Sequence, residues 1–317
     1  MKVFKTFDEQ IVILKDDKKL IINDEEKAKS ILMKENYYNM INGYSDLFII
    51  PNSSPEEFIS GTTFDEIYIL YEFDRHLRNI IFAFILKVES VLRTQIAYTF
   101  SKYHGIDNYF KYDNFETFIG TNTAKKTINN QAKKIHSLIS KLQSDISKSI
   151  DTKEYIKHYI IDHGYIPLWV LVNAMPLGTL SKFYTLMKQN ERVEISKYWE
   201  MAEQDLGSCI KSLAFYRNLC AHDERVFNSK SGIIPNTSIH NTLNIPIVKG
   251  EYICGKKDVF SLVIVLKILL SDDEFRTFYN KVNGRIVSLS GKISTSYLTN
   301  VLNEMGFPSN WKDIRNI

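Results

Sequence analysis

The sequence predicts an all-α protein, a helical bundle with an N-terminal helical module and a C-terminal helical extension. Over most of the 317 residues, apolar positions recur at i, i+3 and i+4, the spacing of one helix face, and not in the alternation of strands. Residues 64–103 keep this spacing with no internal proline or glycine, which predicts one long helix or two helices in line. A hydrophobic content of 44% allows a large core.

Residues 1–60 form the predicted N-terminal module. Asp24 precedes a helical pattern that continues to Asn36, and two glutamates follow Asp24 at once, as is typical of a helix start. A tyrosine-rich segment at residues 37–44 comes next, and a turn with two prolines at residues 51–55 follows. We expect these tyrosines to pack against the main body, with stacking on nucleic-acid bases as the alternative.

The predicted helical core spans residues 61–230 and opens with the long helical pattern. Within that pattern Asp74 and Arg78 are four residues apart, and so are Glu89 and Arg93. This is the spacing of an ion pair within one helix. Because both pairs border an apolar face, they could equally reach across to Arg217 or His222, farther along the chain.

A loop predicted for residues 105–120 leads to an amphipathic helix predicted for residues 127–150, whose inner face begins at Ile128. Lysines lie on another face of this helix. The candidates for RNA binding among them are Lys133, Lys134, Lys141 and Lys148. A charged helix face is most often only solvated. The excess of lysine still makes this segment the best candidate in the chain for contact with an RNA backbone.

Two further helical segments follow, one opened by Pro167 and one that restarts at residue 180 after a break at residues 176–179. The C-terminal extension, residues 231–317, begins with a long loop that could contain a small hairpin. Helical patterns return at residues 258–270 and 272–283.

The richest chemistry is at residues 215–222, Phe-Tyr-Arg-Asn-Leu-Cys-Ala-His, at the end of a helix predicted for residues 204–219. Arg217 continues the apolar stripe of that helix, and a guanidinium is costly to bury without a partner. Asn218 and His222 share a neighbouring face. A fixed cation, an amide and an imidazole could together act on a phosphodiester. The alternative is structural, because a helix dipole favours histidine at a C-terminal end and Arg217 could pair with a buried carboxylate.

Composition and missing motifs narrow the function classes. A net charge of +3 permits a nucleic-acid partner without requiring one. Three cysteines do not form a disulfide framework. No apolar run is long enough to span a bilayer and the N-terminus has no signal sequence, so we expect a cytoplasmic protein without a membrane partner. Metal-ligand spacings and nucleotide-binding loops are absent from the sequence, and we expect neither a metal nor an organic cofactor.

Several short stretches, taken in order, are similar to one protein family. They are residues 36–38, 43–44, 71–78, 89–94, 167–170, 178–181, 217–222 and 305–308, with Trp311 near the end. On these stretches the chain resembles the Abi (abortive infection) proteins of the AbiD/AbiF type, a branch of the HEPN superfamily. The resemblance implies an HEPN-like helical bundle and a homodimer in which two Arg…His motifs meet as one ribonuclease site. In this sequence the motif is Arg217 and His222, with Asn218 between them.

The resemblance also implies a toxin of bacterial anti-phage defence, restrained in some relatives by a structured non-coding RNA. The prediction is therefore a metal-independent endoribonuclease that cuts RNA through attack of the 2′-OH, with Arg217 stabilising charge and His222 moving protons. The predicted supporting residues are Glu89, Arg93, Asp74 and Arg78. A non-catalytic helical module that binds RNA, such as a structured non-coding RNA, is the alternative, and a protein-interaction adaptor is a third hypothesis.

Overall fold

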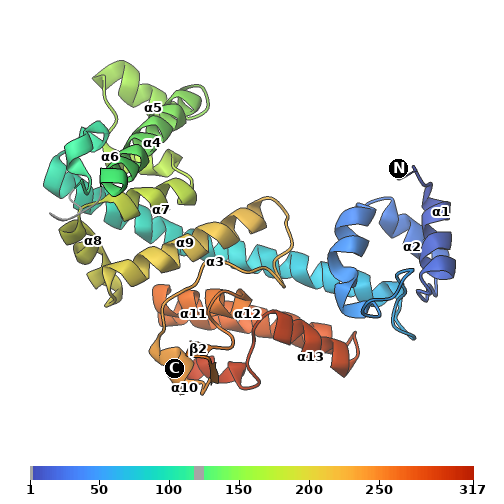
Figure 1. The fold of residues 1–317 in the computed structure, drawn as a ribbon. Coiled ribbons are helices and arrows are strands. Elements are labelled where there is room, and N and C mark those ends of the chain that lie inside the picture. The colour runs from blue at the N-terminus through green and yellow to red at the C-terminus, as the bar shows by residue number, and fades with distance from the viewer. Residues whose placement is uncertain (1–2, 118–124) are drawn as a thin grey trace.

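The computed structural model describes residues 3–117 and 125–317, and its central element is the helix α3 (Phe64–His104). This is one continuous helix of 41 residues. Thr63 and Glu66 form a capping box at its start. Gly105, with a φ of 84°, ends it, because glycine adopts a positive φ without steric cost. Helices from all parts of the chain lie along α3 (Figure 1).

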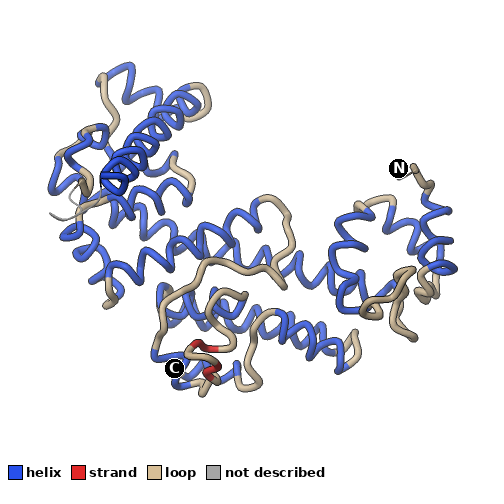
Figure 2. Tube along the Cα trace, in the orientation of Figure 1, coloured by secondary structure: helices blue, strands red, loops and turns tan. Residues whose placement is uncertain are grey.

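The all-α prediction is confirmed. Within residues 3–117 and 125–317, the paired strands form one small antiparallel hairpin, β1 (Ile247–Val248) and β2 (Glu251–Tyr252) (Figure 2). This hairpin lies in the loop at the start of the C-terminal extension, where the sequence allows one. The same loop also forms a short helix, α10 (Ser238–Thr242), which the sequence analysis did not predict.

The N-terminal module packs at one end of α3 (Figure 1). Its elements are α1 (Phe7–Val12), the π-helical turn η1 (Ile13–Asp17), α2 (Glu25–Leu32), the π-helical turn η2 (Tyr38–Asn42) and the 3-10 turn η3 (Ser45–Phe48). The Asp24 side chain caps α2 by accepting a hydrogen bond from the N–H of Lys27. Tyr44 is buried and stacks on Phe227, as expected for a packing tyrosine, whereas Tyr38 is 70% exposed.

A second group of helices packs at the opposite end of α3 (Figure 1). Its elements are η4 (Asn108–Phe110), η5 (Tyr112–Asn114), α4 (Lys125–Ile150), α5 (Glu154–His158), η6 (Tyr159–His163), α6 (Leu168–Leu171), η7 (Val172–Ala174), α7 (Leu177–Leu186), α8 (Gln189–Ser196) and η8 (Lys197–Trp199). The last residues of the loop predicted at 105–120 lie outside the described residues.

Two details of this group differ from the predictions. Ile128, expected on the inner face of α4, is 46% exposed, because the core contacts of this helix begin farther along, at Ile135. The break in helical structure predicted at residues 176–179 is shorter in the structure. Pro176 has extended backbone angles and serves as the N-cap, so α7 begins immediately at Leu177.

The remaining helices complete one continuous hydrophobic core. α9 (Glu203–Ala221) packs against α3 and α7. The C-terminal helices lie along another flank of α3 (Figure 1). They are α11 (Val259–Leu269), α12 (Asp272–Ser290), α13 (Thr295–Glu304) and the 3-10 turn η9 (Trp311–Asn316). The apolar run of α11 is almost entirely buried by these neighbours, and none of the helices in the described ranges could cross a membrane.

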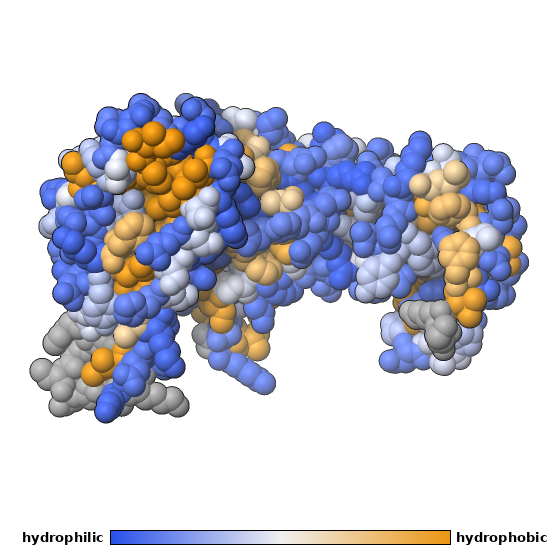
Figure 3. Space-filling model, turned by 90° about the horizontal axis from the view of Figure 1, so that it is seen from above, coloured by the Kyte–Doolittle hydropathy of each residue, from blue (hydrophilic) through white to orange (hydrophobic). Residues whose placement is uncertain are grey.

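Seen from above, the surface is hydrophilic along the middle of the molecule (Figure 3). Apolar side chains gather at its two ends, over the N-terminal module and over the group of helices at the opposite end of α3. The middle of this face is thus mainly polar, as a surface in contact with water is.

Candidate functional site

The Arg-Asn-Leu-Cys-Ala-His motif lies at the C-terminal end of α9, which runs antiparallel to α3. Arg217 is opposite Glu89, and Asp223, just after the helix, is opposite the earlier residue Arg78. His222 is the C-cap, and its N–H donates to the carbonyl of Asn218 at 3.1 Å. Asp223 then adopts a φ of 56°, a left-handed conformation that Asp tolerates better than most residues, and this turns the chain back toward α3.

Glu89 is the acidic centre beside Arg217. Its side chain is 2% exposed, and one oxygen accepts a hydrogen bond from Nη2 of Arg93. The other oxygen, Oε2, is 3.9 Å from Nε of Arg217. Arg93 also donates to the carbonyl of Met175 at 3.0 Å, which fixes its position. Burial raises the pKa of Glu89, and the guanidinium groups of Arg93 and Arg217 act against that shift.

The contact between Arg217 and Glu89 is an ion pair and not a hydrogen bond. Nε of Arg217 and Oε2 of Glu89 have no hydrogen-bond partner among the described residues. The Arg217 side chain is 26% exposed, and its guanidinium carbon lies 5.7 Å from the ring centroid of Phe82. Charge and a cation–π contact thus hold the guanidinium in place while part of it stays accessible to an anion.

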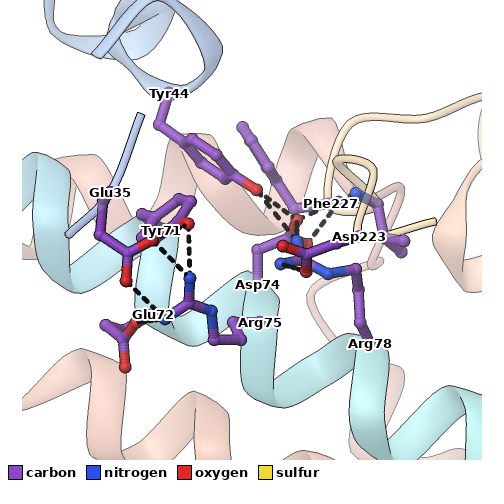
Figure 4. A network of polar contacts seen from close by, with 10 residues as sticks. Glu35, Tyr44, Tyr71, Glu72, Asp74, Arg75, Arg78, Asp223 and Phe227 are labelled. Carbon is purple, nitrogen blue, oxygen red and sulfur yellow. Dashed lines mark hydrogen bonds and ion pairs between the residues drawn. The ribbon is translucent and has the colours of Figure 1, made fainter. Parts of the chain in front are cut away.

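A second buried carboxylate, Asp74, organises the turn after the motif (Figure 4). It is fully buried and accepts hydrogen bonds from the hydroxyl of Tyr44 at 2.7 Å and from Nη1 of Arg78 at 2.8 Å. The backbone N–H groups of Val226 and Phe227 donate to it at 3.0 and 2.8 Å. Burial raises the pKa of Asp74, and these four donors oppose the increase. One side chain thereby joins the N-terminal module, α3 and the segment after α9.

Arg78 extends this network to the residue next to His222. It is almost fully buried and donates to Tyr44, to Asp74 and, through Nη2, to the carboxylate of Asp223. Farther out, Arg75 pairs with acidic side chains, so the polar contacts continue toward the N-terminal module (Figure 4). The position of the turn at Asp223, directly after His222, therefore depends on the buried guanidinium of Arg78 on α3.

His222 itself is exposed and lines a cavity of about 560 Å³. The opposite wall of this cavity is formed by η2 in the N-terminal module, with Tyr38, Asn39 and Asn42. Asn228, from the chain after the motif, also faces it. The histidine therefore opens onto a polar cavity, whereas Arg217 points to α3.

The structure thus divides the predicted site residues into two groups, each formed where α3 meets the end of α9. Arg217 lies with Glu89 and Arg93, and the turn after His222 is held by Asp74 and Arg78. Both ion pairs with i, i+4 spacing form, and both also reach across to the α9 segment. Asn218 is exposed on the same side of the helix end as His222.

The predicted lysines separate in a similar way. Lys133 and Lys134 line a cavity of about 630 Å³, together with Lys182 of α7 and Lys211 of α9. Lys141 instead pairs with Asp145 on its own helix at 2.5 Å, and Lys148 is exposed near the end of α4. Sequence reasoning missed Lys182 and Lys211 because each is an isolated lysine on its own helix. Only the packing of α4, α7 and α9 brings the four together.

The described residues contain no group of three or more His, Cys, Asp or Glu side chains that could hold a metal ion. The cluster of Arg217, Glu89 and Arg93 carries two cations and one carboxylate, a set suited to an anionic ligand.

Comparison with protein families gives one match. The family described as Abi-like protein matches residues 30–228, a range that contains α3, both carboxylate networks and the whole Arg…His motif. Comparisons with curated proteins and with solved structures give no match. Because the family match covers more than half of the 317 residues, the chain belongs to the Abi-like protein family.

Proposed function

We propose that this Abi-like protein is an endoribonuclease of abortive infection, a toxin of the HEPN type that cuts RNA without a metal ion. Family membership supports the role in abortive infection. The ribonuclease proposal rests mainly on Arg217, whose guanidinium is held by Glu89 yet stays partly exposed, one helical turn and a half before the exposed His222. This is a fixed cation near a group that can move protons.

The chemistry requires few protein groups, because the ribose 2′-OH of RNA is itself the nucleophile. A base removes the 2′-OH proton, O2′ attacks the adjacent phosphorus, and the bond from phosphorus to O5′ breaks. An acid then protonates O5′, which leaves a 2′,3′-cyclic phosphate and a 5′-hydroxyl. An imidazole serves either proton step near neutral pH, and the Arg217 guanidinium stabilises the charge on the non-bridging oxygens.

A dimer explains how one site obtains both an acid and a base. One chain offers one His222, at the exposed end of α9, while Arg217 beside it faces α3. Two copies related by a two-fold axis through the α9 ends would bring a second His222 and a second Asn218 to the same phosphate. We therefore propose a homodimer with a composite site.

The four supporting residues act by positioning. Glu89 and Arg93 set the direction of the Arg217 guanidinium, and Asp74 and Arg78 set the turn that carries His222. Since Asp74, Arg78 and Glu89 are buried, removal of one partner leaves an uncompensated charge, at a cost of about 3–5 kcal/mol.

RNA binding is supported by the lysine cavity between α4, α7 and α9. Four lysines converge on it, and no Asp or Glu is among its described lining residues. Such a surface attracts a phosphate backbone and releases counterions on binding. Lys148, exposed near the end of α4, extends this charge, whereas Lys141 adds less because it pairs with Asp145. A structured non-coding RNA that restrains the toxin would bind the same surface.

The alternative function, a helical RNA-binding module without catalysis, is favoured by one observation. The lysine cavity is separate from the cavity that His222 lines, so RNA could bind without contact to the motif. In that case the Arg217 and Glu89 pair would serve only the packing of α9 on α3.

Cleavage of mixed cellular RNA in EDTA separates the two functions. Wild type and His222→Ala are compared, with His76→Ala as the matched control because His76 is an exposed histidine on α3 outside both cavities. Loss of cleavage only in His222→Ala, with 2′,3′-cyclic phosphate ends in the other two, supports the ribonuclease. RNA binding without cleavage by any of the three proteins supports the binding module. Equal cleavage by wild type and His222→Ala contradicts the assigned site.

A further inference from the structure

We propose that the cavity beside His222 is a nucleobase pocket, through which the N-terminal module selects the unpaired RNA base next to the bond that is cut. The inference rests on the proposed ribonuclease function and adds sequence selectivity to it. The cavity lies between η2 and the segment that follows α9, and its volume of about 560 Å³ is within the range of small-ligand sites.

Tyr38 provides a stacking surface at this cavity. Its side chain is 70% exposed, whereas the neighbouring Tyr44 is 3% exposed and packs on Tyr71 and Phe227. A large aromatic ring that the core does not use is available to a planar ligand. Proteins that bind single-stranded RNA commonly stack its bases on exposed aromatic side chains.

Amide side chains surround the same cavity. Asn39 and Asn42 come from η2, and Asn228 comes from the opposite wall. An amide places a hydrogen-bond donor beside an acceptor, which matches the edge of a base and can distinguish one base from another. The η2 turn is fixed by Asn36, whose side-chain oxygen accepts from the N–H groups of Tyr38 at 2.9 Å and Asn39 at 3.3 Å. This capping presents Tyr38 and Asn39 in defined positions.

The two walls of the cavity are tied together, so the pocket exists before a ligand binds. Arg225 donates to the carbonyl of Gly43 and lies 3.6 Å from the carboxylate of Asp46. Tyr44 and the segment after α9 share the carboxylate of Asp74. The N-terminal module is therefore fixed to the same segment that carries His222.

Charge favours a base over a phosphate in this cavity. Asp223 and Glu224 line it with one cation, Arg225, so the lining has no excess of positive charge to hold a phosphate, and its carboxylates can accept hydrogen bonds from exocyclic amino groups. The lysine cavity has the opposite character, because four lysines and no described carboxylate line it. Most of the RNA backbone is thus expected at the lysines, with the scissile phosphate at His222 and the neighbouring base in the cavity.

The test maps cleavage sites on a pool of short random-sequence RNAs with wild type, Tyr38→Ala, Tyr38→Phe and Asn42→Ala. Tyr198→Ala is the matched control, since Tyr198 is also exposed but lies outside the cavity. We expect Tyr38→Ala to raise KM about tenfold, the value of one stacked base, and Tyr38→Phe to restore it. Asn42→Ala should flatten the base preference at one position. Thermal stability should be unchanged in all four variants.

Unchanged KM and unchanged base preference in Tyr38→Ala and Asn42→Ala would overturn the inference while leaving the ribonuclease intact. If wild type cuts no RNA, the proposed function fails, and binding of oligo(A), oligo(C), oligo(G) and oligo(U) by wild type and Asn42→Ala then tests the pocket alone. If wild type binds the four oligonucleotides with different affinities and Asn42→Ala reduces those differences, the pocket is supported. If wild type binds all four with equal affinity, the pocket is refuted.

Discussion

Oε2 of Glu89 and Nε of Arg217 face each other at 3.9 Å, and neither atom has a hydrogen-bond partner in the described part of the chain. A direct hydrogen bond would require an approach of about 3 Å. The carboxylate therefore orients the guanidinium by charge without consuming its donors. Because Nε is buried, a phosphate would bind at the Nη groups, and two N–H groups of a guanidinium can bind it in parallel.

Glu89→Gln tests this relationship. The amide keeps the shape of the side chain and removes the charge that orients Arg217, so we expect kcat/KM for RNA cleavage to fall at least tenfold. The control is Glu194→Gln, which removes a carboxylate from a surface ion pair with Lys102 and should have little effect, because exposed pairs contribute about 0–1 kcal/mol. Full activity of Glu89→Gln would contradict a positioning role.

Asp74→Asn should destabilise the protein strongly. An amide oxygen cannot accept all four hydrogen bonds that reach Asp74, and Arg78, which is almost fully buried, loses its main counter-charge. We expect the free energy of unfolding in urea to fall by about 3–5 kcal/mol. Asp272→Asn removes an almost fully exposed carboxylate that pairs with Lys267, and should change the free energy of unfolding little. A loss below about 1 kcal/mol in Asp74→Asn would argue against a central role for this network.

A buried histidine predicts a pH dependence of stability. His240 is fully buried, accepts the N–H of Thr237 at Nδ1 and donates from Nε2 to the carbonyl of Gly255 at 2.9 Å. Burial lowers the pKa of His240, with nearby Lys256 adding to the effect. The unfolded chain takes up a proton below about pH 6.5 while the folded protein does not, so stability falls as pH drops through that range.

His240→Gln should remove that part of the pH dependence. The free energy of unfolding, measured between pH 7.5 and 5, should fall less steeply in this variant than in wild type, whatever its absolute stability. His76→Gln is the matched control, since His76 is exposed and should leave the slope unchanged. Parallel curves for wild type and His240→Gln would show that His240 titrates normally in the folded protein.

The lysine cavity gives a prediction about salt. RNA binding is measured in the His222→Ala background, in which no cleavage is expected. Lys133→Ala and Lys211→Ala, both in the cavity, should each weaken binding and reduce the salt slope by about one unit. Lys141→Ala should have a smaller effect, because Asp145 already neutralises Lys141. Lys292→Ala, on the cavity between α3 and α12, is the control. Equal slopes for all of these proteins would place the RNA elsewhere.

Local signals in the sequence predicted most of the helices. The long run from residue 64 and the cap at Asp24 depend on neighbours in the chain, and both elements form as expected. The i, i+4 pairs are local in the same sense. The contacts that these pairs make with distant segments are not local. Asp74 meets the N–H groups of Val226 and Phe227 only after α9 has packed on α3.

The candidate site shows the same limit. Arg217 and His222 stand out from the sequence by residue type and spacing, but that they face different neighbours follows from the end of α9 and the turn at Asp223. The exposure of Tyr38 and the convergence of Lys182 and Lys211 on the α4 lysines also arise from tertiary packing. The periodicity of apolar residues along a helix does not predict such contacts between distant segments.

A composite site makes a quantitative prediction for mixed dimers. If cleavage needs His222 from both copies, a wild-type chain paired with a His222→Ala chain is inactive. Wild type and His222→Ala, unfolded and refolded together in equal amounts, should then keep about a quarter of the activity of the same total amount of wild type, since random pairing makes one dimer in four fully wild type. Asn300→Ala, an exposed change on α13, should keep full activity in the same mixture. Retention of half the activity would show that each chain carries a complete site, and the dimer would then have to be assigned a role other than supplying the second histidine.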